Sequence, residues 1–346
     1  MAVKHLRRVF QVACLALFVL LAWGGAEVLT GAPGRDLFVR LDPAGALAVL
    51  LADRSLTAKL APGLALLATG LLLGRAFCGW ACPLGAMLDL TDGFFRKGRT
   101  ARTLPRGMKY GLLAALLAVA LAGLNLAFWA APLPLAARFW ALAAWPPAAW
   151  LADQALALLG PLARRSGATG LAFAEIPVPG YDTALFIAVF FALLLGLGVV
   201  APRLWCRVLC PAGAALGFVG RAAPWRRVVS DACTACGACA RTCPAGAIAA
   251  DEPRATDHAE CLKCLHCRDI CPQRAISFLF GRQSGTAATS PLRRALVAGL
   301  ACGAGAALLG RAGPALGKPS GVLRPPGALP EPEFLARCVR CGLCAA

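Results

Sequence analysis

Two stretches of the 346-residue chain carry the same arrangement of four cysteines and a proline. Residues 233–244 read CTACGACARTCP and residues 261–272 read CLKCLHCRDICP, so both have the spacing C-x2-C-x2-C-x3-C-P. In two-cluster iron–sulfur proteins the first three thiolates of such a run bind one cluster, and the fourth binds the other. The spacing therefore predicts two [4Fe–4S] clusters that share their ligands across the two runs.

The predicted ligand sets follow directly from this crossing-over of the fourth cysteine. One cluster takes Cys233, Cys236, Cys239 and Cys271, and the other takes Cys261, Cys264, Cys267 and Cys243. A structural zinc site is the alternative, because C-x2-C pairs also bind zinc, but the third cysteine and the C-P ending favour iron. The segments AGAI and QRAI that follow the runs predict short strands. We therefore interpret residues 223–282 as a small α+β ferredoxin module of the bacterial two-cluster type.

Outside this module the chain is dominated by long apolar stretches without charge. Hydrophobic residues make up 59% of the sequence, which is typical of a membrane protein. A bilayer-spanning helix needs about 20 apolar residues. The predicted spans are residues 9–26, 60–74, 110–137, 183–202 and a short glycine-rich fifth at 295–310. Residues 139–163 contain Pro146-Pro147 and three tryptophans, so we expect a re-entrant or interfacial piece there, with an additional span as the alternative.

The expected fold is thus an α-helical membrane protein with four to five transmembrane helices and one ferredoxin module. The sequence divides into a membrane domain at 1–222, the module at 223–282, a fifth segment at 283–312 and a further ferredoxin-like start at 313–346. The net charge is +18, and the basic stretches at the N-terminus, at 95–109 and at 203–282 fall on one side of these spans. That side is predicted to be cytoplasmic, in a bacterial inner membrane, with the C-terminal segment periplasmic. Nucleic acid is not an expected partner, because no basic helix interleaved with aromatic residues is present.

A second cysteine motif occurs twice, at the ends of two apolar stretches. Residues 77–85 read FCGWACPLG and residues 205–213 read WCRVLCPAG. Residues four apart lie on one face of a helix, so we expect Cys78, Cys82, Cys206 and Cys210 to meet in one redox site at the cytoplasmic membrane face. Four thiolates suit an iron–sulfur cluster, two dithiol/disulfide pairs are the rival chemistry, and simple packing of small apolar side chains is the third possibility.

Other residue patterns limit the cofactors. The three histidines all lie outside the apolar stretches and no C-x-x-C-H motif is present, so neither haem b nor haem c is expected. No G-x-G-x-x-G motif opens a helix after a strand, so NAD is not expected either. The ending RCVRCGLCAA gives a partial third site of Cys338, Cys341 and Cys344, which indicates a truncated chain or a site that borrows a ligand. We interpret Trp80 and Trp205 as interface anchors, and Arg75 as a charge that reaches out of the apolar layer.

With these motifs, residues 5–282 resemble the NapH family of membrane quinol dehydrogenase subunits. The stretch from Pro291, with Arg293-Arg294 and the last three cysteines, resembles the start of a NapG-type ferredoxin subunit. The resemblance implies that the chain oxidises quinol from the membrane quinone pool and passes electrons towards a periplasmic or membrane redox partner, such as nitrate reductase. The alternative is an assembly or regulatory protein that uses its clusters to reduce a metal or a disulfide for a respiratory enzyme.

Overall fold

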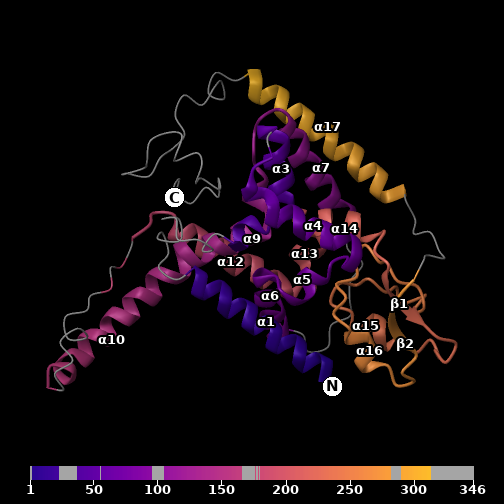
Figure 1. The fold of residues 1–346 in the computed structure, drawn as a ribbon, viewed down its shortest axis with the longest axis horizontal. Coiled ribbons are helices and arrows are strands. Elements are labelled where there is room, and N and C mark those ends of the chain that lie inside the picture. Colours follow the sequence, from indigo (N-terminus) through magenta and orange to yellow (C-terminus); the bar gives the residue numbers. More distant parts are fainter. Residues whose placement is uncertain are drawn as a thin grey trace.

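The computed structural model describes residues 2–22, 37–54, 56–95, 105–165, 176, 178, 180–281 and 290–312. Most of these residues form a body of packed helices, and residues 225–280 form a smaller module close to the N-terminal end of the first helix (Figure 1). The described chain is therefore mostly helical with one small α+β part, as the sequence predicts.

The helical body contains both long helices and very short ones. A π-helical segment, Phe139–Ala144, leads into α10, and short 3-10 segments, Ala58–Leu60 and Leu197–Val199, precede α4 and follow α12. The α-helices are α1 (Ala2–Leu21), α2 (Leu37–Arg40), α3 (Pro43–Asp53), α4 (Ala61–Leu73), α5 (Ala76–Trp80), α6 (Pro83–Phe95), α7 (Gly107–Leu121), α8 (Ala127–Ala130), α9 (Pro132–Arg138), α10 (Trp145–Arg165), α12 (Ala184–Gly196), α13 (Leu204–Val208), α14 (Pro211–Gly220) and α17 (Ser290–Ala312).

Both copies of the C-x3-C-P motif have the same local structure. An apolar helix (α4 or α12) leads to a short helix with the first cysteine (α5 or α13), and the next helix (α6 or α14) begins at the proline after the second cysteine. Pro83 and Pro211 suit this place, because the first helical residue needs no backbone N–H. The N–H of Gly213 donates to the sulfur of Cys210 at 3.2 Å, and the equivalent bond in the first copy is 3.5 Å long. The repeated sequence thus folds into a repeated helical unit.

The two units share one buried apolar core. Helix α14 packs against α3, α4 and α7, and α12 packs against α6 and the π-helical segment. In this core the rings of Phe139 and Phe191 stack with their centroids 4.5 Å apart. Three of the four motif cysteines, Cys82, Cys206 and Cys210, belong to the same buried cluster. The core therefore contains one cysteine of the first pair and both cysteines of the second pair.

Helix α17 lies along α7 through small residues (Figure 1). A Cβ atom built on Gly299 would overlap the backbone of Gly111, and one built on Gly303 would lie 2.5 Å from the carbonyl oxygen of Ala115. Glycines four residues apart allow two helices to approach this closely. The glycine-rich fifth stretch predicted at 295–310 is therefore a helix in which packing against α7 explains Gly299 and Gly303.

The module is closed by two antiparallel strands, β1 (Trp225–Val229) and β2 (Ile276–Phe280). Helices α15 (Ala238–Arg241) and α16 (His266–Ile270) occupy the same position in the two cysteine runs. The strand predicted after QRAI is confirmed as β2, but the strand predicted at AGAI is wrong. There the N–H of Ala247 donates to the sulfur of Cys243 at 3.3 Å, and its carbonyl accepts from Asp257 at 2.8 Å. The backbone of AGAI therefore makes hydrogen bonds within the cysteine loop and not in a sheet. The strand that pairs with β2 is β1, which precedes the first cysteine run.

The prediction of one continuous helix over residues 110–137 is wrong. Helix α7 ends at Leu121, and Gly123 adopts a φ of +89° that favours glycine. The side chain of Asn125 then accepts a hydrogen bond from the N–H of Ala127 at 3.2 Å, which begins α8, and Pro132 begins α9. The glycine and the capping amide turn the chain, so this stretch forms three helices.

Pro146-Pro147 lie where the helical pattern changes. The π-helical segment Phe139–Ala144 leads without a gap into α10, and the α-helix then continues to Arg165. In Figure 1 this helix points away from the rest of the helical body. The described end of α10 carries exposed apolar side chains, among them Trp150 and Leu158.

Two of the expected membrane spans, at 60–74 and 183–202, correspond to helices that are shorter than the predicted stretches. Helices α4 and α12 have 13 residues each, whereas α1, α10 and α17 have 20, 21 and 23. None of the helices in the described ranges combines the length and the hydropathy that crossing a bilayer requires.

Candidate functional site

Two cavities in the module are each lined by four cysteines. The inner cavity is the one nearer the helical body, and the other is called the outer cavity. The fourth cysteine of each run crosses to the cavity of the other run, so the structure brings together both predicted ligand sets. The inner cavity is lined by Cys243, Cys261, Cys264 and Cys267, and the outer cavity by Cys233, Cys236, Cys239 and Cys271.

The same backbone turn forms both cavities. Two positions in each run have a positive φ: Ala235 and Gly237 in the first run, and Lys263 and Leu265 in the second. Left-handed backbone is uncommon for residues other than glycine and persists where the surrounding structure demands it. Because the turns fall at identical places, each run can direct three sulfurs into one cavity.

The donors around the cavities fit an iron–sulfur cluster. All the predicted ligands are sulfur, and soft thiolates select Fe–S clusters and zinc over hard cations. Arg227 donates to the sulfur of Cys239 at 3.5 Å, and Arg254 and Arg241 donate to the carbonyls of Cys233 and Cys236 at 3.1 Å each. These cations would offset the negative charge of the cysteine thiolates that bind a cluster. Among the described residues no three His, Cys, Asp or Glu side chains converge tightly enough to hold a single metal ion.

Burial keeps the free thiols of Cys261 and Cys267 in the inner cavity protonated. It raises the pKa of Cys261 to about 11 and that of Cys267 to about 12, above the usual range of a thiol. A bound metal removes such protons, since a coordinating thiol is deprotonated outright. Loading of this cavity should therefore release protons, and iron would replace them as the partner of the sulfurs.

The two C-x3-C-P motifs meet in the helical body and form the four-cysteine site: Cys78, Cys82, Cys206 and Cys210. Cys78 is half-buried, and the other three are buried. All three buried thiols lie within electrostatic range of Cys78, and Cys82 and Cys210 each also lie within range of Cys206. The sequence prediction that the pairs come together therefore agrees with the geometry, and every cysteine of the described residues is a free thiol.

Two buried arginines tie the repeats together reciprocally. Arg75 precedes the first motif and donates to the carbonyl of Cys206 in the second at 3.0 Å. Arg203 precedes the second motif and donates to the carbonyls of Cys78 and Gly85 in the first, at 2.8 and 3.1 Å. Each arginine thus crosses to the opposite repeat and binds the first cysteine there. Both cations lie beside thiols whose anionic forms they would stabilise.

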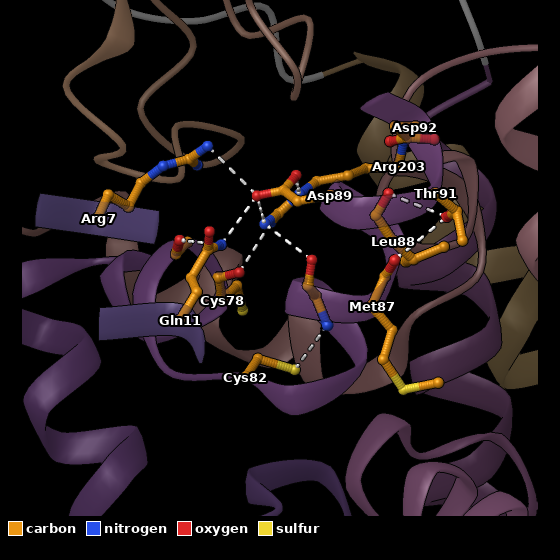
Figure 2. Close-up of polar contacts among 12 residues, drawn as sticks. Arg7, Gln11, Cys78, Cys82, Met87, Leu88, Asp89, Thr91, Asp92 and Arg203 are labelled. Atoms are coloured by element: carbon orange, nitrogen blue, oxygen red, sulfur yellow. Dashed lines mark hydrogen bonds and ion pairs between the residues drawn. The ribbon is translucent and has the colours of Figure 1, made fainter. Parts of the chain in front are cut away.

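Asp89 of α6 holds Arg203 in place, as Figure 2 shows. The Nε and Nη2 atoms of Arg203 bind the two carboxylate oxygens of Asp89 at 2.6 and 2.7 Å. Gln11 and Arg7 of α1 also reach this carboxylate, at 2.8 and 3.3 Å. A bidentate arginine–carboxylate pair has a fixed geometry, so the position of Arg203 against the cysteines is well determined.

Arg75 is held by Glu260, which comes from the module and directly precedes the inner-cavity ligand Cys261. The Nη1 atom of Arg75 lies 2.7 Å from Glu260, Lys109 binds the same carboxylate oxygen, and Tyr110 donates to the other at 3.2 Å. Burial raises the pKa of this carboxyl, but the neighbouring Arg75 and Lys109 outweigh burial and hold the pKa below its usual range. Glu260 is therefore an anion that links the module to the four-cysteine site.

The inner cavity lies directly against the four-cysteine site. Cys78 packs in one apolar cluster with Cys243, Cys261 and Cys264. Further contacts join the same part of the module to the body: Arg106 donates to the carbonyl of Gly246 and pairs with Asp257 at 3.6 Å. Two sets of cysteines with different sequence patterns are thus neighbours in space.

Comparisons with known proteins agree with this arrangement. A family described as a 4Fe-4S binding domain matches residues 60–102 and 183–229, which include both C-x3-C-P motifs. A second family of the same description matches residues 227–249. The ferredoxin-type protein NapH of Haemophilus influenzae is 26% identical over 292 residues, which cover 79% of this chain and 88% of the relative. NapH of Escherichia coli is 27% identical, with 81% and 90% covered.

The chain is similar to NapH-type polyferredoxins. The methylamine utilization ferredoxin-type protein MauN of Methylorubrum extorquens is also similar, at 29% identity over 69% of this chain and 73% of the relative. No solved structure matches the chain. The matches support iron–sulfur electron transfer as the function of this chain.

Sequence reasoning missed the two arginines of the four-cysteine site. The signal was present, because both motif copies begin with an arginine three residues before the first cysteine, which makes the repeat R-x-x-C-x3-C-P. The interpretation of Arg75 as a charge reaching out of the apolar layer is wrong, since its side chain is buried and bound to Glu260 and Cys206. Trp80 donates to the carbonyl of Lys263 at 3.0 Å, so it contacts the module.

The other residues to place are the three C-terminal cysteines and two histidines of the module. Cys338, Cys341 and Cys344 lie outside the described residues. His266 lines the inner cavity as a polar neighbour, and burial with the nearby Lys263 lowers the pKa of His258 to about 4, so that its ring is neutral.

Proposed function

We propose that this chain is a membrane-bound electron-transfer subunit that oxidises quinol and passes electrons towards a periplasmic reductase. The observation that carries the proposal is that Cys78 of the four-cysteine site packs against the same apolar cluster as Cys261 and Cys264 of the inner cavity. Twelve cysteines are thereby arranged as three consecutive sites. The resemblance to NapH supports electron flow from the quinone pool to a respiratory partner.

The site residues divide into three proposed centres. The inner and outer cavities would each hold one [4Fe–4S] cluster on the four cysteines that line them. The four-cysteine site would hold a third iron–sulfur cluster, a choice supported over a disulfide by the 4Fe-4S family match across both motifs. When bound, an iron–sulfur cluster stores and releases one electron at a time. The cysteines at 338–344 remain a proposed partial site.

Exposed apolar side chains support a membrane location next to the four-cysteine site. Leu71, Leu72 and Leu73 end α4 immediately before Arg75, and all three are exposed. Exposed Leu185, Phe186, Val189, Leu193, Val199 and Val200 lie in α12 and the turn after it, before Arg203. Large exposed apolar areas mark membrane or apolar-ligand surfaces. Each repeat thus offers an apolar approach that ends at its arginine and its first cysteine, which suits a lipid-dissolved quinol.

The charges of the chain support the same placement. The basic loop at 95–109 and the arginine-rich module fall on one proposed side, which the positive-inside rule assigns to the cytoplasm. The oxidation of one quinol delivers two electrons and two protons. The protons go to water, and the electrons leave singly to the oxidised form of the partner reductase. The chain itself would bind quinol next to the buried cysteines of the four-cysteine site. The positive charges of Arg75 and Arg203 would balance the negative charge of thiolates there.

The test uses the full-length protein in proteoliposomes under anaerobic conditions. Addition of a short-chain quinol analogue should reduce the iron–sulfur centres, seen as the appearance of their electron paramagnetic resonance (EPR) signals. The quinone form of the same analogue is the control and should give no signals. Signals that appear with dithionite but not with the quinol would contradict the proposal and favour the assembly or regulatory role.

A further inference from the structure

We infer that Gly79 is the position at which the ferredoxin module docks on the four-cysteine site, and that Gly79 and Trp80 are positioning residues that hold the inner cavity there. This inference rests on the proposed function, because it concerns the contact between the same two sets of cysteines. It predicts that a single methyl group at residue 79 weakens their coupling without removing any ligand.

The contact at Gly79 is one of backbone against backbone. A Cβ atom built on Gly79 would overlap the carbonyl oxygen of Leu262 and would lie 3.4 Å from both the carbonyl carbon and the Cβ of that residue. Real Cβ atoms do not approach backbone oxygens so closely, so one of the two segments would have to move. Gly79 has an ordinary helical conformation in α5, and therefore space, not backbone strain, requires a glycine here.

The two segments in contact are those that carry the ligands. Gly79 follows Cys78 directly, and Leu262 lies between Cys261 and Cys264 of the inner cavity. The carbonyl of Gly79 accepts a hydrogen bond from Gln11 at 3.0 Å, so α1 fixes this segment from its other side. The residue after Cys78 thus lies directly against the backbone between two inner-cavity cysteines, and it has no side chain.

Trp80 fixes the neighbouring position. Its indole N–H donates to the carbonyl of Lys263 at 3.0 Å, and the ammonium of Lys263 donates to the carbonyl of Trp225 in β1. On the opposite side of the contact, Glu260 is bound by Arg75. The loop from Glu260 to Lys263 is therefore held at both ends, and only its middle faces Gly79.

The outer cavity is placed beyond the inner one. Cys239 and Cys271 of the outer cavity pack in one cluster with Cys243 and Cys267 of the inner cavity, whereas Cys236 is exposed to solvent. The order in space is the four-cysteine site, the inner cavity, the outer cavity and then solvent. Electron exchange slows steeply with distance, so the inner cavity is the side at which the module and the four-cysteine site exchange single electrons.

The experiment compares Gly79→Ala with Gly93→Ala in the full-length protein. Gly93 is a matched control because it is also a helical glycine, in α6, and a Cβ atom there would have no neighbour within 4 Å. Iron content and the EPR signals after dithionite reduction report whether the centres assemble. The magnetic interaction between the reduced centres reports how closely they approach. The rate of module reduction by a quinol analogue then gives the functional effect.

We expect Gly79→Ala to keep its iron, to weaken the magnetic interaction and to slow quinol-driven reduction by roughly tenfold or more, since small misplacements of reacting groups carry such costs. Gly93→Ala should match the wild type. Equal magnetic interaction and equal rates in the two variants would overturn the inference. A wild type that quinol does not reduce would instead contradict the proposed function, while the magnetic comparison after dithionite would still decide the docking.

A second variant covers the case in which Gly79→Ala fails to assemble. Trp80→Phe removes only the indole hydrogen bond to Lys263 and keeps an aromatic ring. It should retain iron and show the same two effects at smaller size. If Gly79→Ala loses its iron and Trp80→Phe behaves as the wild type in both measurements, the inference is wrong.

Discussion

Arg203→Met should destabilise the helical body by about 3–5 kcal/mol, because it removes one partner of a buried ion pair. The side chain of Arg203 has no exposed surface, and it satisfies Asp89 together with the carbonyls of Cys78 and Gly85. Methionine fills similar space but donates no hydrogen bond. The loss should appear in thermal unfolding, and the iron of the four-cysteine site should be lost first.

Arg54→Met is the matched control for this substitution. Arg54 and Arg203 both have positive φ values, 53° and 50°, so a change to methionine meets the same backbone conformation at each. The side chain of Arg54 is exposed, and its substitution should change the unfolding temperature little. If the two variants unfold alike, the buried arginine does not stabilise the site in the way described here.

Cys82→Ser and Cys210→Ser should each abolish quinol-driven reduction of the ferredoxin module. Both sulfurs are buried at the junction of the repeats, and each accepts a backbone hydrogen bond at the start of a helix. A serine hydroxyl keeps the shape and the capping role but is a poor ligand for iron and has no thiol redox chemistry. Stopped-flow absorbance with a quinol analogue measures the rate, and dithionite should still reduce the module fully.

Cys302→Ser provides the control, because Cys302 is an exposed residue of α17 without a partner in either repeat. Its quinol-driven rate should equal that of the wild type. Full turnover in Cys82→Ser and Cys210→Ser would show that the C-x3-C-P motifs have a packing role only.

The features predicted most accurately from the sequence are those that depend on the spacing of residues close together in the chain. The positions of Cys233 to Cys271 determine which sulfurs can share a cavity, because each run is a short turn with a repeated backbone conformation. The meeting of the two C-x3-C-P motifs was also predictable, since a duplicated sequence with the same flanks folds into duplicated units. Both predictions needed no knowledge of the tertiary contacts.

Contacts between distant segments were not predictable in the same way. Glu260 looks like a linker residue in the sequence, yet Arg75, Lys109 and Tyr110 all bind it from the helical body. The broken helix after Leu121 was missed because apolar composition outweighed Gly123 and Asn125. The prolines at 146–147 mark a change from π-helix to α-helix, which the sequence alone does not specify. The role of Gly79 depends on what lies opposite it, which a single sequence does not contain.

The central claim is that the four-cysteine site is an iron–sulfur centre beside the ferredoxin module, and its most direct test is the iron content of the full-length protein. The difference between the wild type and the Cys82→Ser and Cys210→Ser variants should be about four irons per chain, the content of one cluster. The EPR signals of the module should be unchanged. Equal iron content with loss of quinol-driven reduction would indicate dithiol chemistry instead, and equal iron content with full activity would contradict the account.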